Sequence, residues 1–411
     1  LDVKTAFLHG NLEERILMEQ PEGYSEGNKV FLLQKSLYGL KQSPRQWNLR
    51  FDKFMKAQNF KRSDYDSCVY FKCYGEGKYV YLLLYVDDML VAAKDLKEVE
   101  KVKKILSIEF EMKDLGPAKR ILGMDIIRDR AQGTLILSEE AYIDKVLRNF
   151  GITDFKPVQT PIGCHFKLSS TKEDEKAETE SEMRSIPYSS AVGSLMYAMV
   201  GSRPDIAHVV GLVSRFMSAP NQEHWKAVNW ILRYLRGSSM CYLTFKKNDK
   251  FDIKGYCDID YAADLDRRRS ITGYVFQVGG NTVSWRSGLQ HIVAVSSTKA
   301  EYMALAEATK ETLWLKRITS ELGFEQKTVE IFCDSQNAIC LAKNSVFHER
   351  TKHIQIRYHF IRDVIAEGDL VLTKINTSIN PADLLTKPLP VKKFEDGRRD
   401  LRVLRHWLAK K

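Results

Sequence analysis

The sequence holds 411 residues, which suggests roughly two or three domains of about 150 residues each. Hydrophobic residues make up 44% of the chain and aromatic residues 10%, so it can bury hydrophobic cores and is not an intrinsically disordered protein. The formal net charge of +10 favours a polyanionic partner, such as a nucleic acid or an anionic surface. No apolar stretch reaches the ~18 residues of a membrane span, so a membrane protein is excluded.

The cysteines and the first residues add two expectations about the protein's context. The 7 cysteines include no CxxC pair, which favours a reducing intracellular compartment and argues against a structural zinc site. The chain begins LDVKTAFLHG, with no Met and no signal-peptide pattern. We therefore expect a piece of a longer, intracellular product.

Residues 1–118 mix short apolar strands with helices. The segment 31–60 predicts a strand or turn followed by an amphipathic helix, in which Trp47, Phe51, Phe54 and Met55 recur at helical spacing. The apolar runs 79–86 and 89–93 predict two strands that meet at Asp87 and Asp88. A second helix is expected over 95–110.

Residues 119–249 begin with a strand, a hairpin turn, a second strand and a helix that ends near Gly151. Residues 169–185 are polar and acidic, which predicts a flexible linker. Three helices are expected over 187–236, with Pro204 in the first turn of the second and Asn221 as the N-cap of the third.

Residues 250–390 predict three strands, a long helix over 296–323, and then strands and helices in alternation. This βββαβαβα order is typical of an α+β or α/β domain. The last segment, 391–411, is basic and is expected to be loosely ordered.

Two adjacent carboxylates, Asp87 and Asp88, interrupt an otherwise apolar segment. Burying an unpaired carboxylate costs roughly several kcal/mol of folding free energy, even after the surrounding structure relaxes. At a tight hairpin both can lie near one edge, where Mg²⁺ can neutralise them. A polar hairpin turn without any metal is the alternative. Asp2 offers a third carboxylate, and Phe7 either packs near a bound sugar or belongs to the core.

A second set of acidic residues lies at predicted strand ends and helix starts. Asp258 and Asp334 end strands, whereas Glu301 and Asp383 lie in first helical turns. Each one alone also has a structural explanation, because an acidic side chain suits a helix N-terminus. Together, the four can converge at one end of a sheet and hold two metal ions.

The segments LDVKTAFLHGNLEE, SLYGLKQSPRQW and YVDD, in this order, resemble the reverse transcriptase palm of copia-type LTR retrotransposons. The resemblance implies that Asp2, Asp87 and Asp88 are the catalytic metal triad, holding two divalent ions ~4 Å apart. It places Phe7 at the steric gate against a ribose 2′-OH. The template and nucleotide contacts would come from Gly39, Lys41 and Pro44. Since this family keeps a fingers subdomain upstream, we expect a truncated palm that does not polymerise DNA alone.

The region 250–390 resembles the ribonuclease H domain of the same family, through GYCDIDYAADLDRRRSITGYVF, SSTKAEYMALAEATKETLWLK, CDSQNAICLAKN and NPADLLTKPLP. The resemblance implies that Asp258, Glu301, Asp334 and Asp383 hold two metal ions and cleave RNA in an RNA/DNA hybrid. Many relatives have acidic residues where this chain has Lys299 and Gln355, neither of which is an expected ligand. Asp260 and Asp264 are assigned no ligand role.

The middle region resembles the family's thumb and connection, which grip the primer–template. Three basic residues on one predicted helix either contact phosphates or form an ordinary solvated face: Lys226, Arg233 and Arg236. The spacing of His348, His353 and His359 suits no common zinc site.

These observations predict an α+β multidomain fold: a truncated polymerase palm (1–118), a thumb/connection (119–249), an RNase H-like α/β domain (250–390) and a basic tail (391–411). The expected cofactor is Mg²⁺, two ions per active site, with Mn²⁺ as a possible substitute. Expected partners are an RNA template, a DNA primer, RNA/DNA hybrid, deoxynucleoside triphosphates if the polymerase is completed, and upstream Pol segments, but no membrane.

The resemblance implies a cytoplasmic virus-like particle or the nucleus as the location. The expected function is that of a reverse transcriptase/ribonuclease H fragment in which hybrid cleavage is the more intact activity. One alternative is a catalytically silent, nucleic-acid-binding remnant of a decayed element. Another is an accessory fragment that works only when joined to its N-terminal part.

Overall fold

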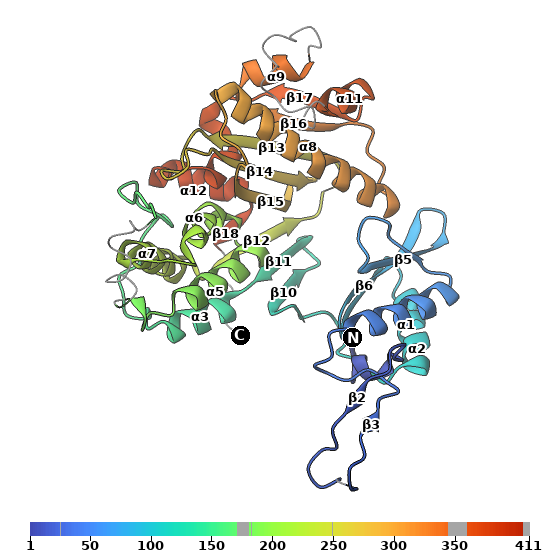
Figure 1. Ribbon diagram of the computed structural model, residues 1–411. Helices are drawn as coiled ribbons and strands as arrows, with labels where there is room; N and C mark the ends of the chain where they lie inside the picture. The colour runs from blue at the N-terminus through green and yellow to red at the C-terminus, as the bar shows by residue number, and fades with distance from the viewer. Residues whose placement is uncertain (25, 171–180, 182, 249, 344–359, 406–411) are drawn as a thin grey trace. The chain divides into compact units, whose positions relative to one another are not determined.

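The computed structural model describes all residues except 25, 171–180, 182, 249, 344–359 and 406–411 (Figure 1). The chain divides into two compact units, which are described separately. Unit 1 comprises Leu1–Ile121 and Arg317–Glu325, and unit 2 comprises Leu122–Lys316 and Gln326–Lys411. The predictions on His348, His353, Gln355 and His359, and on most of the acidic linker, lie outside the described residues.

Unit 1 is built on a six-stranded sheet in the order β4-β5-β6-β7-β1-β8. The strands are β4 (Lys61–Arg62), β5 (Val69–Gly75), β6 (Lys78–Tyr85), β7 (Asp88–Ala93), β1 (Asp2–Val3) and β8 (Met112–Lys113). The helical elements are η1 (Ala6–His9), α1 (Ser43–Ala57) and α2 (Leu96–Glu109). Two further strands, β2 (Leu17–Met18) and β3 (Phe31–Leu32), pair with each other, and β9 (Arg120–Ile121) ends the unit.

The core of unit 1 follows the predicted stripe on α1. Trp47, Phe51, Phe54 and Met55 are all buried and belong to one hydrophobic cluster with residues of β6 and α2. Trp47 also donates its indole N–H to the backbone carbonyl of Val86, at 2.6 Å. The helix is thereby attached to the β6–β7 turn, where the predicted aspartates lie.

Unit 2 contains an antiparallel sheet with the strand order β18-β12-β11-β10. The strands are β10 (Met124–Asp129), β11 (Thr134–Ser138), β12 (Cys241–Lys246) and β18 (Val403–Arg405). The accompanying helices are α3 (Glu140–Asn149), α5 (Tyr188–Gly201), η3 (Pro204–Ile206), α6 (Ala207–Val213), η4 (Ser214–Phe216) and α7 (Gln222–Ser238). The predicted cap is confirmed, because the Asn221 side chain accepts a hydrogen bond from the His224 N–H at the start of α7.

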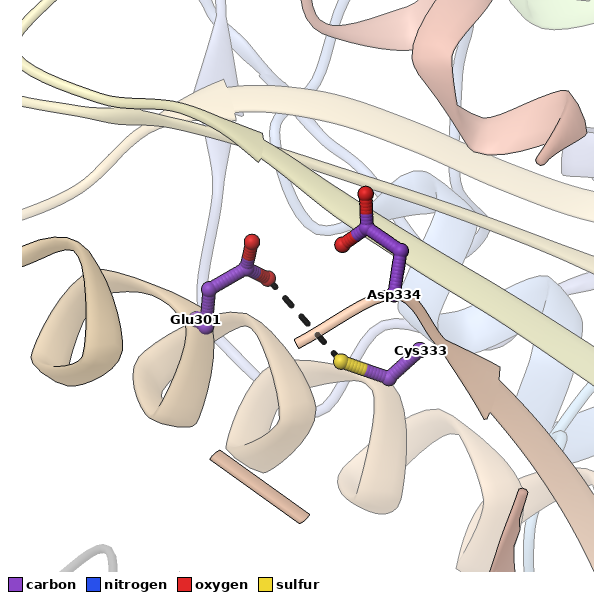
Figure 2. A group of neighbouring side chains, drawn as sticks. All are labelled: Glu301, Cys333 and Asp334. Carbon is purple, nitrogen blue, oxygen red and sulfur yellow. Dashed lines mark hydrogen bonds between the residues drawn. The ribbon is translucent and has the colours of Figure 1, made fainter. Parts of the chain in front are cut away.

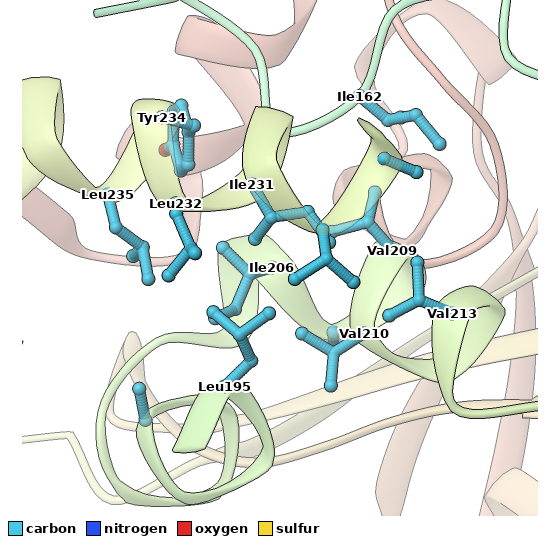
Figure 3. Packing of buried hydrophobic residues seen from close by; sticks show 14 of the residues in the cluster. Ile162, Leu195, Ile206, Val209, Val210, Val213, Ile231, Leu232, Tyr234 and Leu235 are labelled. Atoms are coloured by element: carbon cyan, nitrogen blue, oxygen red, sulfur yellow. The ribbon is translucent and has the colours of Figure 1, made fainter. Parts of the chain in front are cut away.

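The largest hydrophobic cluster of the described residues joins these helices (Figure 3). Leu195 of α5, Val210 of α6 and Ile231 of α7 point toward one another in it. The cluster also includes Leu384 and Leu385 from the short helix η7 (Pro381–Leu385). The helical core thus supports the segment that carries Asp383.

The expectation of a loosely ordered tail is wrong for residues 391–405. They form α12 (Val391–Asp400) and strand β18, which pairs with β12 through Val403 and Leu243. Phe394, Leu401 and Val403 are buried. Basic residues on the exposed side of α12 dominate the composition, whereas these few apolar side chains determine the packing.

The second sheet of unit 2 is mixed, in the order β15-β14-β13-β16-β17. Its strands are β13 (Ile253–Asp260), β14 (Ile271–Val278), β15 (Asn281–Leu289), β16 (Val329–Cys333) and β17 (Leu370–Lys374). β13, β14 and β15 are antiparallel, and β16 is parallel to both β13 and β17. The remaining helices are α8 (Ser297–Glu321), α9 (Gln336–Lys343), α11 (Phe360–Ala366) and η6 (Thr377–Ile379). The end of α8, from Arg317, is assigned to unit 1.

This arrangement confirms the predicted order of three strands, a long helix and alternating strands and helices. Among the described residues, no helix combines the length and the apolar character needed to cross a membrane.

Candidate catalytic centres

The three aspartates predicted in unit 1 lie at one end of neighbouring strands. β6 and β7 form a hairpin in which Tyr85 pairs with Asp88, so Asp87 lies in the turn. Val86 takes the left-handed backbone conformation, with φ 57°, which lets the chain reverse within two residues. Asp2 is the cross-strand partner of Asp88 in the next strand, β1. The prediction that the pair lies at a hairpin is therefore confirmed.

The electrostatics of this end of the sheet favour a cation. Burial raises the pKa of Asp88 above its ordinary value, and the neighbouring carboxylates of Asp87 and Asp2 raise it further. Asp87 is exposed, whereas Asp2 and Asp88 are half-buried. Three carboxylates in one small region repel one another unless a positive charge neutralises them.

The other residues predicted for this centre lie on nearby elements of unit 1. Phe7 belongs to η1 and is half-buried; its ring centroid lies 4.8 Å from that of the exposed Tyr38. Gly39 has φ +97°, a conformation that few other residues adopt, and no atom lies within 4 Å of where a Cβ would be. Lys41 and Pro44 are exposed around the start of α1. Their roles as steric gate and nucleotide contacts stay predictions.

The topology of unit 2 explains why Asp258 and Asp334 lie together. In the parallel pair β13–β16, Cys257 and Cys333 are direct partners. Asp258 and Asp334 each follow one of these cysteines, so both lie near the carboxyl ends of adjacent strands. Glu301 lies in the second turn of α8, and Asp383 in η7.

Glu301, Cys333 and Asp334 form a close group, with ligand atoms that all lie within 4.8 Å of one another (Figure 2). The Cys333 thiol donates to Glu301 Oε2 at 4.0 Å. Glu301 has an exposed fraction of only 8%. Burial raises the pKa of Glu301 to about 10, with further contributions from Cys333, Asp258 and Asp334. The prediction that Glu301 faces the sheet is confirmed.

Asp258 and Asp383 form the other half of the centre and share a lysine. Lys387 Nζ lies 3.1 Å from Asp258 Oδ2 and 3.1 Å from Asp383 Oδ1. Burial raises the pKa of Asp258 to about 7; Lys387 opposes this shift and Asp383 adds to it. Lys393 pairs with Asp383, and the Thr386 hydroxyl donates to Asp258.

Sequence reasoning missed the three residues that stabilise these buried carboxylates: Thr386, Lys387 and Lys393. The signal was present, because Lys387 follows Asp383 by four residues, a spacing at which a Lys can reach an Asp in a helical segment. The structure thus brings all four predicted carboxylates to one region. Glu301 and Asp334 lie in one close group, Asp258 and Asp334 follow paired cysteines on adjacent strands, and Lys387 bridges Asp258 and Asp383.

These residues fit a divalent metal ion. Carboxylate oxygens are the ligands that Mg²⁺ prefers. The Glu301 carboxylate is buried, and among the described residues its only hydrogen-bond donor is a thiol. A cation between Glu301, Asp334 and Asp258 would favour the charged form of Glu301 and so oppose the effect of burial on its pKa. The choice between Mg²⁺ and Mn²⁺ stays a prediction.

Several neighbouring polar residues have structural partners. Asp264 pairs with Arg215 at 3.7 Å, in keeping with the absence of a predicted ligand role. On α7, Lys226 pairs with Glu223 at 2.6 Å, and Arg233 donates to the carbonyl of Lys156 at 2.8 Å. Phosphate contacts from this helix stay a prediction.

Comparisons with known proteins agree with this geometry. Residues 1–164 match the family model described as "Reverse transcriptase (RNA-dependent DNA polymerase)". The chain is 54% identical over 398 residues to the retrovirus-related Pol polyprotein from transposon TNT 1-94 of Nicotiana tabacum, covering 96% of this chain and 30% of that protein. It is 35% identical over 317 residues to the putative transposon Ty5-1 protein of Saccharomyces cerevisiae, covering 76% of this chain and 100% of that protein.

A solved structure supports the fold class. The foamy viral protease-reverse transcriptase in complex with RNA/DNA hybrid aligns with a TM-score of 0.52 at 12% identity, covering 100% of this chain and 45% of that chain. The predicted fold, a polymerase palm with thumb/connection followed by an RNase H-like domain, is confirmed. The individual domain boundaries stay predictions.

Proposed function

The chain belongs to the reverse transcriptases of copia-type retrotransposon Pol polyproteins, and from this premise we propose that it cleaves the RNA strand of RNA/DNA hybrids in a metal-dependent reaction. The observation that carries the proposal is the clustering of four carboxylates, three of them buried, near the carboxyl ends of β13 and β16. Glu301 and Asp334 belong to one close group, and Lys387 bridges Asp258 and Asp383. Perturbed carboxylates that share one small region are typical of functional sites.

The proposed roles follow from the contacts. Asp258, Glu301, Asp334 and Asp383 would hold two Mg²⁺ ions, which activate a water molecule and neutralise the charge that develops on the scissile phosphate. Asp334 is oriented by the Thr377 hydroxyl, which donates to its Oδ2 at 2.7 Å.

Lys387 has a second part in this proposal. In the metal-free protein it neutralises Asp258 and Asp383. When metal ions take over that role, its ammonium group becomes free to contact a phosphate of the bound strand.

For unit 1 we propose the polymerase role of the family, with Asp2, Asp87 and Asp88 as metal ligands. The chain spans about 30% of the tobacco relative's length, so the complete polymerase is a property of the longer Pol protein. Its proposed partners are an RNA template, a DNA primer, deoxynucleoside triphosphates and upstream Pol segments, in a cytoplasmic particle or the nucleus.

The main rival is a silent remnant that binds nucleic acid without cleaving it. The net charge of +10 suits both proposals, but the buried acidic set favours an active site, because four linked carboxylates are costly to keep in a protein that only binds polyanions.

Mg²⁺-dependent cleavage of a labelled RNA/DNA hybrid tests the proposal, with Asp334→Asn as the site variant. Asp252→Asn is the matched control. Asp252 lies just before β13, is half-exposed, and pairs with Lys254 rather than with the proposed metal ligands. Cleavage by the parent and the control, but not by Asp334→Asn, is expected. If the parent binds the hybrid without cleaving it, the silent-remnant hypothesis is favoured. If an added N-terminal Pol segment then restores cleavage, the accessory-fragment hypothesis is favoured instead.

A further inference from the structure

Two buried thiols lie directly beneath the carboxylates of the proposed ribonuclease site. Cys257 and Cys333 are neighbours across the parallel strands β13 and β16, and both have an exposed fraction of 0%. The Cys257 thiol donates to the backbone carbonyl of Phe332 at 3.6 Å. Cys333 also contacts the buried carboxylate of Glu301 (Figure 2). The proposed magnesium chemistry uses neither sulfur.

We propose that Cys333, Glu301 and Asp334 form a binding site for a thiophilic divalent ion of the Zn²⁺ class. Zn²⁺ accepts mixed sulfur and oxygen ligands, with Zn–S of about 2.3 Å and Zn–O of about 2.0–2.2 Å. In a tetrahedral complex these lengths separate the sulfur and oxygen ligand atoms by roughly 3.6 Å. The observed distance from Cys333 Sγ to Glu301 Oε2 is 4.0 Å, and all three ligand atoms lie within 4.8 Å of one another.

The chemistry of the ligands selects the ion. Mg²⁺ is a hard cation that takes oxygen ligands and keeps several waters, so the thiol adds nothing to its binding. Thiolate ligands favour Zn²⁺ and similar ions. On binding, the Sγ–H bond of Cys333 breaks and an Sγ–Zn bond forms. The thiol proton passes to solvent, as does the proton that the Glu301 carboxyl holds at neutral pH. The three anionic ligands then neutralise the ion and leave one net negative charge.

The Glu301 side chain is a second observation that points to a bound cation. It is more than nine-tenths buried, and among the described residues its carboxylate receives a hydrogen bond only from the Cys333 thiol. Buried carboxylates normally accept hydrogen bonds from N–H or O–H groups or bind metal ions. Figure 2 shows Glu301 and Asp334 directed toward the same space beside the sulfur.

The site also has a consequence for activity, and this part rests on the proposed function. Glu301 and Asp334 are two of the four proposed magnesium ligands, so Zn²⁺ and Mg²⁺ compete for them. Zn²⁺ held by the sulfur would therefore inhibit hybrid cleavage, and the inhibition would depend on Cys333.

Titration of the full chain with Co²⁺ tests the site without an activity assay, because a thiolate bound to Co²⁺ gives a charge-transfer absorption band in the near ultraviolet. The parent and the control Cys340→Ser, whose cysteine is exposed on α9, should both show a band that Zn²⁺ abolishes. Cys333→Ser should lose it. Asp334→Asn, which keeps the thiol, should bind Zn²⁺ at least about tenfold more weakly, since the loss of even a supporting contact costs 10-fold or more.

A band that is absent from the parent, or that persists in Cys333→Ser, would overturn the site. Circular dichroism of each variant shows whether it is folded. If Cys333→Ser is unfolded, the Zn²⁺ affinity of Asp334→Asn decides whether the site exists. Zn²⁺ inhibition of cleavage in the parent but not in Cys333→Ser would support the competition. If no variant cleaves hybrid, the proposed function fails while the Co²⁺ result still decides the metal site.

Discussion

A fully buried ion pair in the helical core of unit 2 offers the clearest stability test. Arg203 and Asp205 both have exposed side-chain fractions of 0%. Arg203 donates from Nε and Nη2 to the two Asp205 oxygens, at 2.8 and 2.7 Å. The Tyr234 hydroxyl donates to Asp205 Oδ2 at 2.6 Å, and Arg203 also bonds to Ser238. The pair joins η3 to α7, and η3 contacts η7, which carries Asp383.

Asp205→Asn keeps the shape of the side chain but removes its charge. The guanidinium group of Arg203 is then buried without a counter-ion, and the new amide NH₂ meets a donor instead of an acceptor. Removing one partner of a buried pair costs about 3–5 kcal/mol, so we expect unit 2 to lose that much of its free energy of unfolding. Glu223→Gln breaks the solvent-exposed pair with Lys226 on α7 and should cost about 0.5 kcal/mol or less.

Urea unfolding followed by circular dichroism measures both losses. A combined variant, Arg203→Met with Asp205→Leu and Tyr234→Phe, removes the ion pair and the Tyr234 hydroxyl. It keeps Ser238 and the nearby charge of Arg398. Replacing a buried pair by apolar side chains is often neutral or stabilising, so this variant should recover most of the lost stability. A loss below about 1 kcal/mol in Asp205→Asn, or a combined variant as unstable as Asp205→Asn, would refute the reasoning.

Three further changes test other parts of unit 2. Burial lowers the pKa of His208 from 6.5 to about 3, so the unfolded chain gains a proton at this site that the folded chain does not, and the contribution of His208 to stability falls as the pH drops below 6.5. The raised pKa of Asp258 acts in the opposite direction, so the test is a difference: between pH 8 and 4 the thermal midpoint of His208→Leu should fall less than that of the parent. Lys387→Met leaves Asp258 and Asp383 to repel each other, so the metal-free protein should melt lower and gain more from added Mg²⁺ than the parent; equal gains would contradict the role of the lysine. Val403→Asn should cost about 1.5–3 kcal/mol in urea unfolding, the contribution of one buried Val, whereas an unchanged midpoint would show that β18 adds nothing.

Much of the fold could be predicted because local patterns and tertiary structure agree. The aromatic stripe of α1 is buried as its helical spacing predicts, and the Asn221 cap and the Asp87 turn lie where their residue types are favoured. The order of strands and helices from β13 to β17 followed from apolar runs separated by polar turns. Each of these features depends on residues close together in the sequence.

The features that were missed depend on contacts between distant segments. β18 comprises only Val403–Arg405, so it is too short to be recognised within a basic segment. It forms because β12 pairs with it, and Leu243 of β12 lies 160 residues before its partner Val403. The thiol pair is similar, since Cys257 and Cys333 become neighbours only through the parallel register of β13 and β16. A search for CxxC spacing does not detect such a pair.

The two carboxylate sets differ in how the fold keeps them stable without metal. In unit 1, Asp87 is exposed and Asp2 and Asp88 are half-buried, so water screens much of the repulsion. In unit 2, Asp258 and Asp383 have exposed fractions of 1% each, so water cannot screen the repulsion between them. Lys387 and Lys393 supply the compensating charge there. Among the described residues the only hydrogen-bond donor to Glu301 is a thiol, and burial raises the pKa of Glu301.

This division has a functional meaning. Lys387 lies between Asp258 and Asp383 and holds their geometry in the metal-free protein. Its ammonium group would have to move away before a metal ion could bind at the same position. Glu301 and Asp334 face no such competitor in their described contacts, so the first metal ion is expected to bind between them, beside Cys333. Under the proposed function, Zn²⁺ held there by the sulfur would take two of the proposed magnesium ligands, so hybrid cleavage would fall while Lys387 stays paired with Asp258 and Asp383.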